Sequence, residues 1–356
     1  MTVTDADGHV EESPATFSFL DKEYYGRRPL AVAFERDTVY GPKNAVWLID
    51  GKTYPKFVGK GGVIFRTPTL MELAKEKTAS IPAQELTDVD ARLRDLDKVK
   101  IDKQVVYPTL FLTTTTEDIH LEAALMRSYN SFMADAFSKS RGRIRFAALV
   151  PIRDVEESIR ELRRAKGLGA VAVMLHGLAW DKCLGDKALF PFYEEAANLN
   201  IPVSIHLGWG CPAITDAFDA STNFYSAVLP VLMGFYSIMS SGVLDTFPRL
   251  RFAFLESGSE WLPYVIHRLK GDGKVRRDPA DYFREQRVYV GCEGNENLHY
   301  VVQCIGEDSL IIGSDYPHGD PFHVEVMVGE LEKRTDLSAR LREKMLSDNP
   351  QRLYGL

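Results

Sequence analysis

The chain has 356 residues, of which 45% are hydrophobic and 26% charged, as is ordinary for a globular protein whose core needs no disulfide staples. Its formal charge of −7 argues against a nucleic-acid-binding surface. The four cysteines show no metal-binding spacing, which predicts reduced thiols in a cytoplasmic protein. The first residues have neither the basic start nor the apolar core of a signal peptide.

The first expected strand, over 3–9, ends in polar residues almost at once. Residues from about 14 to 85 then lack any helix–strand rhythm and are rich in Pro, Gly, Tyr and Lys. Within them, a hairpin is expected to turn at Asp50-Gly51. We interpret 14–85 as an irregular insertion or lid after the first strand, and assign 1–13 and 86–356 to the main domain.

From about residue 88, helical patterns alternate with short apolar runs. The expected strands are 3–9, 104–109, 146–151, 170–176, 202–206, 250–256, 287–293 and 309–315, and the expected helices between and after them are 88–98, 121–139, 155–166, 188–199, 220–244, 260–269, 297–305 and 338–346. Near-continuous apolar strands that alternate with helices predict a parallel sheet. Eight such units favour a distorted (β/α)8 TIM barrel, and no glycine-rich nucleotide-binding turn follows any strand.

The stretch 220–244 carries no charge and is long enough to span a bilayer. However, it contains Pro230, Gly234, Gly242 and several hydroxyl residues, and it lacks flanking basic clusters. A helix buried in the barrel wall or in a subunit interface is the preferred interpretation. We therefore expect no membrane span.

Imidazoles and carboxylates gather at the expected strand ends, which in this fold meet at the face that holds the active site. The candidate metal ligands there are Asp7, His9, His176, His206, Glu256 and Asp315. Nitrogen and oxygen donors of this kind suit a divalent cation, which also relieves repulsion among the carboxylates. Six candidates exceed what one ion needs, so one or two ions of zinc, manganese or iron are expected.

Some of these residues have an equally simple structural explanation. His176 is compatible with a core histidine or a substrate contact, and Glu256 with a proton-transfer group instead of a ligand. The residues expected beside the metal ligands are Asp5, Glu293 and His318.

Four motifs together resemble the amidohydrolase superfamily, and within it the amidohydrolase-related branch that includes aminocarboxymuconate-semialdehyde decarboxylase-like enzymes. They are Asp5-Ala-Asp-Gly-His9, Ile205-His206-Leu-Gly-Trp209, Gly313-Ser-Asp-Tyr-Pro-His318 and the closing Asn349-Pro-Gln-Arg-Leu-Tyr-Gly-Leu. The resemblance covers most of 88–356 together with the N-terminal motif. It implies a distorted (β/α)8 barrel, a divalent metal, and hydrolysis or non-oxidative decarboxylation of small, often aromatic, carboxylates.

The resemblance also implies roles for single residues. His206 matches the strand-5 metal histidine, Asp315 the strand-8 aspartate, and His9 the second member of the strand-1 His-x-His pair. Asp7 stands where the first member of that pair would be, a position at which some decarboxylases have Glu. Glu256 stands where the decarboxylases have a proton-transfer histidine, so this chain departs from the pattern there.

Our leading hypothesis is a metal-dependent hydrolase or non-oxidative decarboxylase of a small carboxylated compound. Asp315 would take a proton from metal-activated water, Glu256 would act as ligand or acid/base, and the lid would exclude bulk water. A dinuclear non-haem iron or manganese oxygenase, with His176 and Glu256 as added ligands, is the alternative. A catalytically silent partner subunit is a third possibility. The expected partners are a small-molecule substrate and a second copy of the chain in a homodimer.

Overall fold

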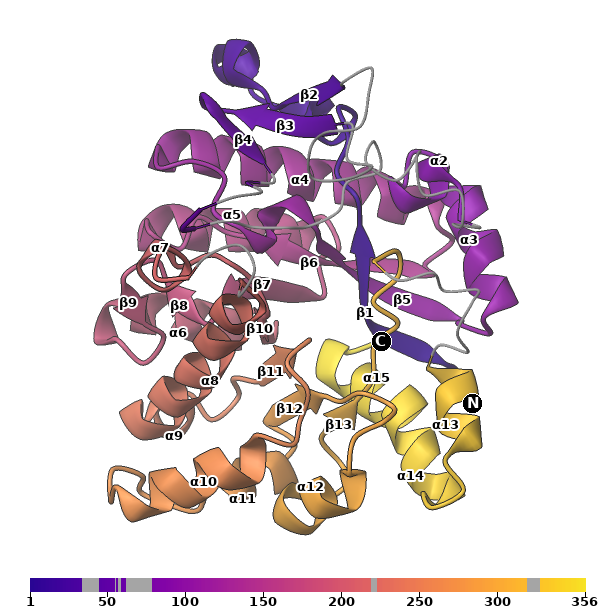
Figure 1. Ribbon diagram of the computed structural model, residues 1–356, viewed down its shortest axis with the longest axis vertical. Helices are drawn as coiled ribbons and strands as arrows, with labels where there is room; N and C mark the ends of the chain where they lie inside the picture. The colour runs from indigo at the N-terminus through magenta and orange to yellow at the C-terminus, as the bar shows by residue number, and fades with distance from the viewer. Residues whose placement is uncertain (34–44, 55, 57–58, 62–78, 219–222, 319–326) are drawn as a thin grey trace.

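Eight parallel strands form the central barrel (Figure 1). The structure is a computed structural model of residues 1–356, and it describes all of them except 34–44, 55, 57–58, 62–78, 219–222 and 319–326. Their order in the sheet is β1-β5-β6-β7-β10-β11-β12-β13. Their bounds are Thr4–Val10, Lys103–Pro108, Ile144–Leu149, Ala172–His176, Val203–His206, Phe252–Leu255, Val288–Gly291 and Leu310–Ile311. The predicted (β/α)8 barrel is confirmed.

The barrel closes where the last strand meets the first. The backbone N–H of Ala6 donates to the Ile312 carbonyl at 3.2 Å, and that of Asp315 donates to the Asp7 carbonyl at 2.9 Å. A Cβ atom at Gly313 would lie 2.4 Å from the Asp7 Cβ, so only glycine permits this approach. The closing contact therefore joins the segments that carry Asp7 and Asp315.

Helices cover the outside of the barrel (Figure 1). The longer ones are α3 (Val89–Lys98), α4 (Ile119–Lys139), α5 (Val155–Gly167), α6 (Phe190–Asn198), α8 (Asn223–Ser241), α10 (Leu262–Gly271) and α12 (Leu298–Ile305). Shorter ones are α2 (Ile81–Gln84), α7 (Pro212–Thr215), α9 (Val243–Thr246), α11 (Pro279–Arg284), α13 (Val328–Lys333), α14 (Ala339–Glu343) and α15 (Asn349–Tyr354). Asp88, Asp118 and Asp154 precede α3, α4 and α5, and each accepts a backbone N–H of the first turn.

Helix α8 corresponds to the uncharged stretch, and it contains Pro230. It packs against β7, β10 and α10 in the barrel wall, where Val231, Phe235 and Ile238 are buried. None of the helices in the described part of the chain has the length and apolar character that crossing a bilayer requires.

The described part of the insertion holds a small antiparallel sheet of β2 (Leu30–Ala33), β3 (Ala45–Ile49) and β4 (Lys52–Tyr54), drawn at the top of Figure 1. Strands β3 and β4 are joined through Asp50-Gly51, as the sequence predicts, and both residues have positive φ. The insertion is linked to the barrel by ion pairs of Arg27 with Asp118 and of Lys52 with Glu117, each 2.6 Å long. Its boundaries at 14–85 stay a prediction.

Three details differ from the sequence-based expectation. The strand expected over 309–315 is regular only at Leu310–Ile311, because the next residues bend toward β1 to close the barrel. The last expected helix, 338–346, continues instead through a π-helical turn at Lys344–Asp348 into α15. A short hairpin of β8 (Leu178–Ala179) and β9 (Lys182–Cys183), which the sequence does not predict, follows β7.

A chain of buried polar residues fixes β1 against its neighbours. Asp5 is fully buried and accepts hydrogen bonds from Gln104 Nε2 at 2.6 Å and from the Ser314 hydroxyl at 2.5 Å. Gln104 in turn accepts from Arg92 Nε at 2.9 Å, and Arg92 Nη2 donates to the His9 carbonyl at 2.6 Å. The buried charges are thus paired or hydrogen-bonded, as burial requires.

We expect Arg92→Met to lower the free energy of unfolding by about 3 kcal/mol, because buried acceptors of Gln104 and His9 lose a charged donor. Urea unfolding followed by circular dichroism measures this change. Arg94→Met is the matched control, since the Arg94 side chain is 65% exposed on the same helix, and its cost should stay within about 0.5 kcal/mol. Equal effects of the two substitutions would contradict the structural role of Arg92.

Candidate metal centre and active site

The C-terminal ends of the barrel strands bring two overlapping groups of potential metal ligands together. Asp7, His9 and His206 each offer one atom, and these atoms lie within 4.8 Å of one another. His9, Asp315 and His318 form the second group by the same criterion. His9 Nε2 is common to both, at 3.6 Å from Asp7 Oδ1 and 3.6 Å from Asp315 Oδ1.

Both central histidines are oriented by backbone carbonyl groups. Nδ1 of His9 lies 2.8 Å from the Pro108 carbonyl oxygen, and Nδ1 of His206 lies 2.8 Å from that of Leu207. A proton on Nδ1 makes each of these contacts a hydrogen bond and leaves the Nε2 lone pair free to bind a metal, as is usual for metal-binding histidines. The backbone therefore fixes the tautomer that ligation needs.

His9 Nε2 supplies a test of whether a metal fits. The side chain is fully buried, and Nε2 has no hydrogen-bond partner among the residues that the structure describes. Buried polar atoms are nearly always paired, so an orphaned nitrogen that faces carboxylates is what a metal-binding position requires. The donor set of imidazole nitrogen and carboxylate oxygen suits zinc, manganese or iron.

Glu256, directly after β11, and Asp315, four residues after β13, have strained backbone. Both have φ in the left-handed region, 52° and 53°, which is uncommon for residues other than glycine and is often found at functional sites. Glu256 Oε2 lies 3.6 Å from His206 Nδ1 and 3.9 Å from His9 Nε2, with no hydrogen bond to any described residue. Burial, and then the neighbouring Asp315, raise the pKa of Glu256 well above its usual range.

The pKa values of the two central histidines are shifted in opposite directions. Burial and the neighbouring His318 and His206 lower the pKa of His9. Burial also disfavours the charged form of His206, but Asp7, whose Oδ1 lies 3.1 Å from Nε2, outweighs this and raises the pKa of His206 to about 9. The carboxylate of Asp7 therefore favours the protonated form of His206, whereas burial keeps His9 neutral and able to bind a metal through Nε2.

His318 lies closer to the centre than the sequence suggests. Its Nδ1 is 2.7 Å from Asp315 Oδ1, its Nε2 is 2.8 Å from the Thr109 hydroxyl, and its ring packs on that of His9 with 4.0 Å between centroids. Asp5 lies away from the ligand group and accepts hydrogen bonds from Ser314 and Gln104. The spacing of Asp315 and His318 in the sequence is the only signal that they are neighbours.

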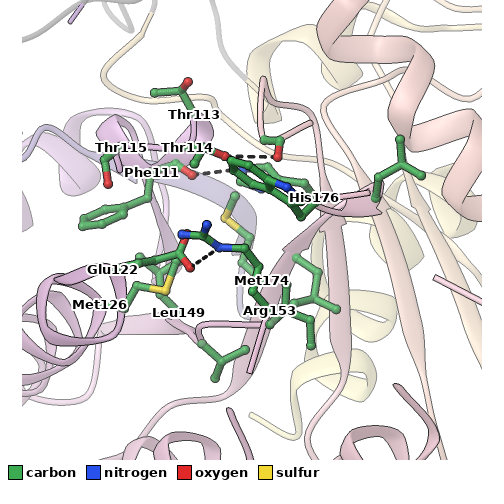
Figure 2. A pocket seen from close by; sticks show the side chains of 16 residues that line it. Phe111, Thr113, Thr114, Thr115, Glu122, Met126, Leu149, Arg153, Met174 and His176 are labelled. Carbon is green, nitrogen blue, oxygen red and sulfur yellow. Dashed lines mark hydrogen bonds and ion pairs between the residues drawn. The ribbon is translucent and has the colours of Figure 1, made fainter. Parts of the chain in front are cut away.

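His176 is turned away from both groups of potential ligands. Strands β7 and β10 align His176 with His206, but His176 Nε2 lies 3.1 Å from the Phe111 carbonyl oxygen (Figure 2). It lines a small cavity of about 40 Å³ beside the part-buried ion pair of Arg153 and Glu122 (Figure 2). Burial, and then His206, lower the pKa of His176 to about 4.

A larger cavity of about 490 Å³ opens beside the metal centre. Its wall includes Asp7, Glu256 and Asp315 together with Glu293, which the sequence predicts at the site. It also includes Glu330 of helix α13, which sequence reasoning missed because Glu330 lies inside a helix far from any strand end. This cavity is large enough for a small aromatic acid.

A family model described as amidohydrolase matches residues 81–356. The chain belongs to the amidohydrolase family. It is 27% identical over 290 residues to a 2-amino-3-carboxymuconate-6-semialdehyde decarboxylase of Dictyostelium discoideum, covering 76% of this chain and 77% of that protein. It is 25% identical over 290 residues to a gamma-resorcylate decarboxylase of Polaromonas sp., covering 75% of this chain and 87% of that protein.

Solved structures share the fold of this amidohydrolase-family chain. An amidohydrolase from Mycobacterium avium subsp. paratuberculosis has a TM-score of 0.79 at 20% identity and covers 100% of this chain and 98% of its own. A dihydroxybenzoic acid decarboxylase from Polaromonas sp., solved with manganese and an inhibitor, has a TM-score of 0.65 at 23% identity. The match covers 84% of this chain and 97% of that structure's chain. The resemblance inferred from the motifs is confirmed, and none of these relatives supports an oxygenase.

We expect His206→Ala and Asp315→Asn each to weaken manganese binding by at least about a hundredfold, because each removes a donor from the group around His9. Elemental analysis after dialysis against graded manganese concentrations measures the change. His176→Gln is the matched control and should leave metal content unaltered, since that imidazole faces the Phe111 carbonyl. Metal loss in His176→Gln with retention in His206→Ala would contradict this assignment.

Proposed function

We propose that this chain is a metal-dependent non-oxidative decarboxylase of a small carboxylated aromatic compound. The observation that carries the proposal is the orphaned, fully buried His9 Nε2, which faces Glu256 and Asp315 beside a cavity of about 490 Å³. The two decarboxylase relatives support this reaction class. The hydrolase reading shares the metal centre but has no comparable support among those two relatives.

In this proposal the metal is held by Asp7, His9, His206 and Asp315. A divalent ion there supplies positive charge that binds a substrate carboxylate and orients the ring beside it. His9 and His206 keep their Nε2 atoms aimed at that point through the carbonyl groups behind them. His318 orients the carboxylate of Asp315, because its Nδ1 lies 2.7 Å from Asp315 Oδ1.

Glu256 is the proposed proton-transfer group. It lines the cavity, and Oε2 has no hydrogen bond to any described residue, so it can face the substrate. A carboxyl group there would deliver its proton to the ring carbon that bears the carboxylate. The carbon–carbon bond then breaks, its electron pair returns to the ring, and carbon dioxide leaves. A water proton restores the acid, so the cycle needs no oxidant.

The insertion at 14–85 is proposed to act as the lid that excludes water from this cavity. The ion pairs of Arg27 and Lys52 with the loop before α4 support its placement over the barrel. A homodimer is the proposed assembly. Helix α8 supports it, because Leu229 and Met233 are each 40% exposed on that helix.

Manganese-loaded enzyme should release carbon dioxide from 2,6-dihydroxybenzoate or a related hydroxylated aromatic acid equally well with and without oxygen. Glu256→Gln should lower kcat by about 10² to 10⁴-fold, because it cannot donate the proton, yet retain metal. Product chromatography and elemental analysis measure the two effects. Glu194→Gln, an exposed residue of α6, should behave as the parent enzyme. Oxygen-dependent turnover, or full activity in Glu256→Gln, would refute the proposal.

A further inference from the structure

Glu12 carries a buried carboxyl group that the proposed mechanism does not use. The residue is 2% exposed and makes no ion pair with any residue that the structure describes. Instead, Glu12 Oε2 accepts the backbone N–H of Leu110 at 2.6 Å and that of Thr109 at 3.2 Å. Burial raises the pKa of Glu12 to about 8, although the Leu110 N–H favours the charged form. A buried carboxyl group held by backbone donors instead of a cation is costly, so its position needs an explanation.

A single peptide unit connects Glu12 to His9. The N–H of Thr109 and the carbonyl group of Pro108 belong to the same planar peptide and point in opposite directions. Glu12 accepts the N–H on one side, and the carbonyl oxygen lies 2.8 Å from His9 Nδ1 on the other side. Because the peptide is planar, holding its N–H also holds the carbonyl group that keeps a proton on His9 Nδ1. The Nε2 lone pair of His9 is thereby kept free for a metal.

The Thr109 side chain leads from the same anchor to His318. Its hydroxyl oxygen lies 2.8 Å from His318 Nε2, and His318 Nδ1 lies 2.7 Å from Asp315 Oδ1. A carboxylate can only accept hydrogen bonds, so the short contact with Asp315 requires a proton on Nδ1. Nε2 of the neutral imidazole is then an acceptor, and the Thr109 hydroxyl donates to it. His318 Nδ1 therefore serves Asp315 and is not available to a metal.

The position of the proton on His318 decides what the second group of potential ligands can do. His9, Asp315 and His318 each offer an atom within 4.8 Å of the others. With its proton on Nδ1, His318 orients Asp315. With the proton on Nε2, it would instead offer Nδ1 to a second ion. The segment that Glu12 holds therefore controls both the ring that binds the metal and the ring beside it.

We propose that Glu12 is a positioning residue of the metal centre. By holding the Thr109 peptide, it makes His9 present Nε2 to the metal. Through the Thr109 hydroxyl, it makes His318 a hydrogen-bond donor to Asp315 instead of a metal ligand. The centre then holds one ion per chain and not two. The inference rests on the proposed function for the placement of the metal.

The test is nuclear magnetic resonance of the histidine ring nitrogens in zinc-loaded full-length protein. Zinc is diamagnetic, and long-range proton–nitrogen correlations show which ring nitrogen carries a proton and which binds the metal. His318→Gln assigns the His318 signal by its loss, and contact between the two rings, whose centroids lie 4.0 Å apart, assigns His9. Both rings should carry a proton on Nδ1, with zinc on Nε2 of His9 alone. Elemental analysis should give about one zinc per chain.

Substitutions at Glu12 and Thr109 separate the two branches. Thr109→Val keeps the backbone N–H and removes the hydroxyl, so it should change the His318 signal and leave that of His9 unaltered. Glu12→Leu should change both signals and weaken zinc binding by about 10- to 100-fold. Glu12→Gln should keep the parent pattern, because one amide oxygen can accept both backbone N–H groups.

Glu161→Leu is the matched control for the loss of a buried glutamate. Glu161 is also 2% exposed, and it accepts hydrogen bonds from Asn130 Nδ2 at 2.6 Å and from Arg164 Nη2 at 2.8 Å, on helix α5 outside the barrel. Its substitution should lower stability without changing either histidine signal or the zinc affinity. Circular dichroism confirms that each variant is folded.

Zinc on His318 Nδ1, an unaltered His9 signal in folded Glu12→Leu, or the same changes in Glu161→Leu would overturn the proposal. If Glu12→Leu does not fold, Thr109→Val decides, because an unaltered His318 signal there would overturn it as well. Carbon dioxide release is measured separately. If no acid is decarboxylated while the histidine signals respond as expected, the proposed function fails and the role of Glu12 stands.

Discussion

The buried hydrogen-bonded chain from Arg92 through Gln104 to Asp5 is the constraint on which the active end of the barrel depends. Asp5 also accepts the backbone N–H and hydroxyl of Ser314, so one carboxylate ties the first strand to the segment that follows the last strand. Gly313 lets the two backbones approach closely enough for this. Asp7 and Asp315, the outer carboxylates of the metal centre, are carried on these same two segments, so barrel closure sets their separation.

Closure creates an electrostatic cost that a bound cation relieves. The side chains of Asp7, Glu256 and Asp315 all lie within 4 Å of His9 Nε2. The other ring nitrogen of His9, Nδ1, is hydrogen-bonded to a backbone carbonyl group. The left-handed backbone of Glu256 and Asp315 adds local strain, which the surrounding barrel maintains. A divalent ion would pair the orphaned nitrogen and offset the clustered charge, so fold and cofactor are expected to stabilise each other.

Much of this arrangement could be predicted from the sequence, because the spacing of apolar residues and the position of a residue at a strand end are local properties of the chain. His206 ends an apolar strand, Asp315 follows another, and His9 lies next to the end of β1. Parallel strands must bring these ends together. Side-chain direction is not local. His176 and His206 occupy aligned positions on neighbouring strands, yet one ring faces the Phe111 carbonyl and the other faces Asp7. Glu330 reaches the cavity from a helix, and no strand-end pattern marks it.

The two positions where this chain departs from the resembling decarboxylases point in one electrostatic direction. Asp7 and Glu256 each stand where that pattern has or allows a histidine. Some decarboxylases already have Glu at the position of Asp7, so the exchange of an imidazole for a carboxyl group at Glu256 is the one that sets this chain apart. Such a site binds a metal ion more firmly but leaves less positive potential for a substrate anion. A substrate with a single carboxylate would therefore suit this site better than a dicarboxylate.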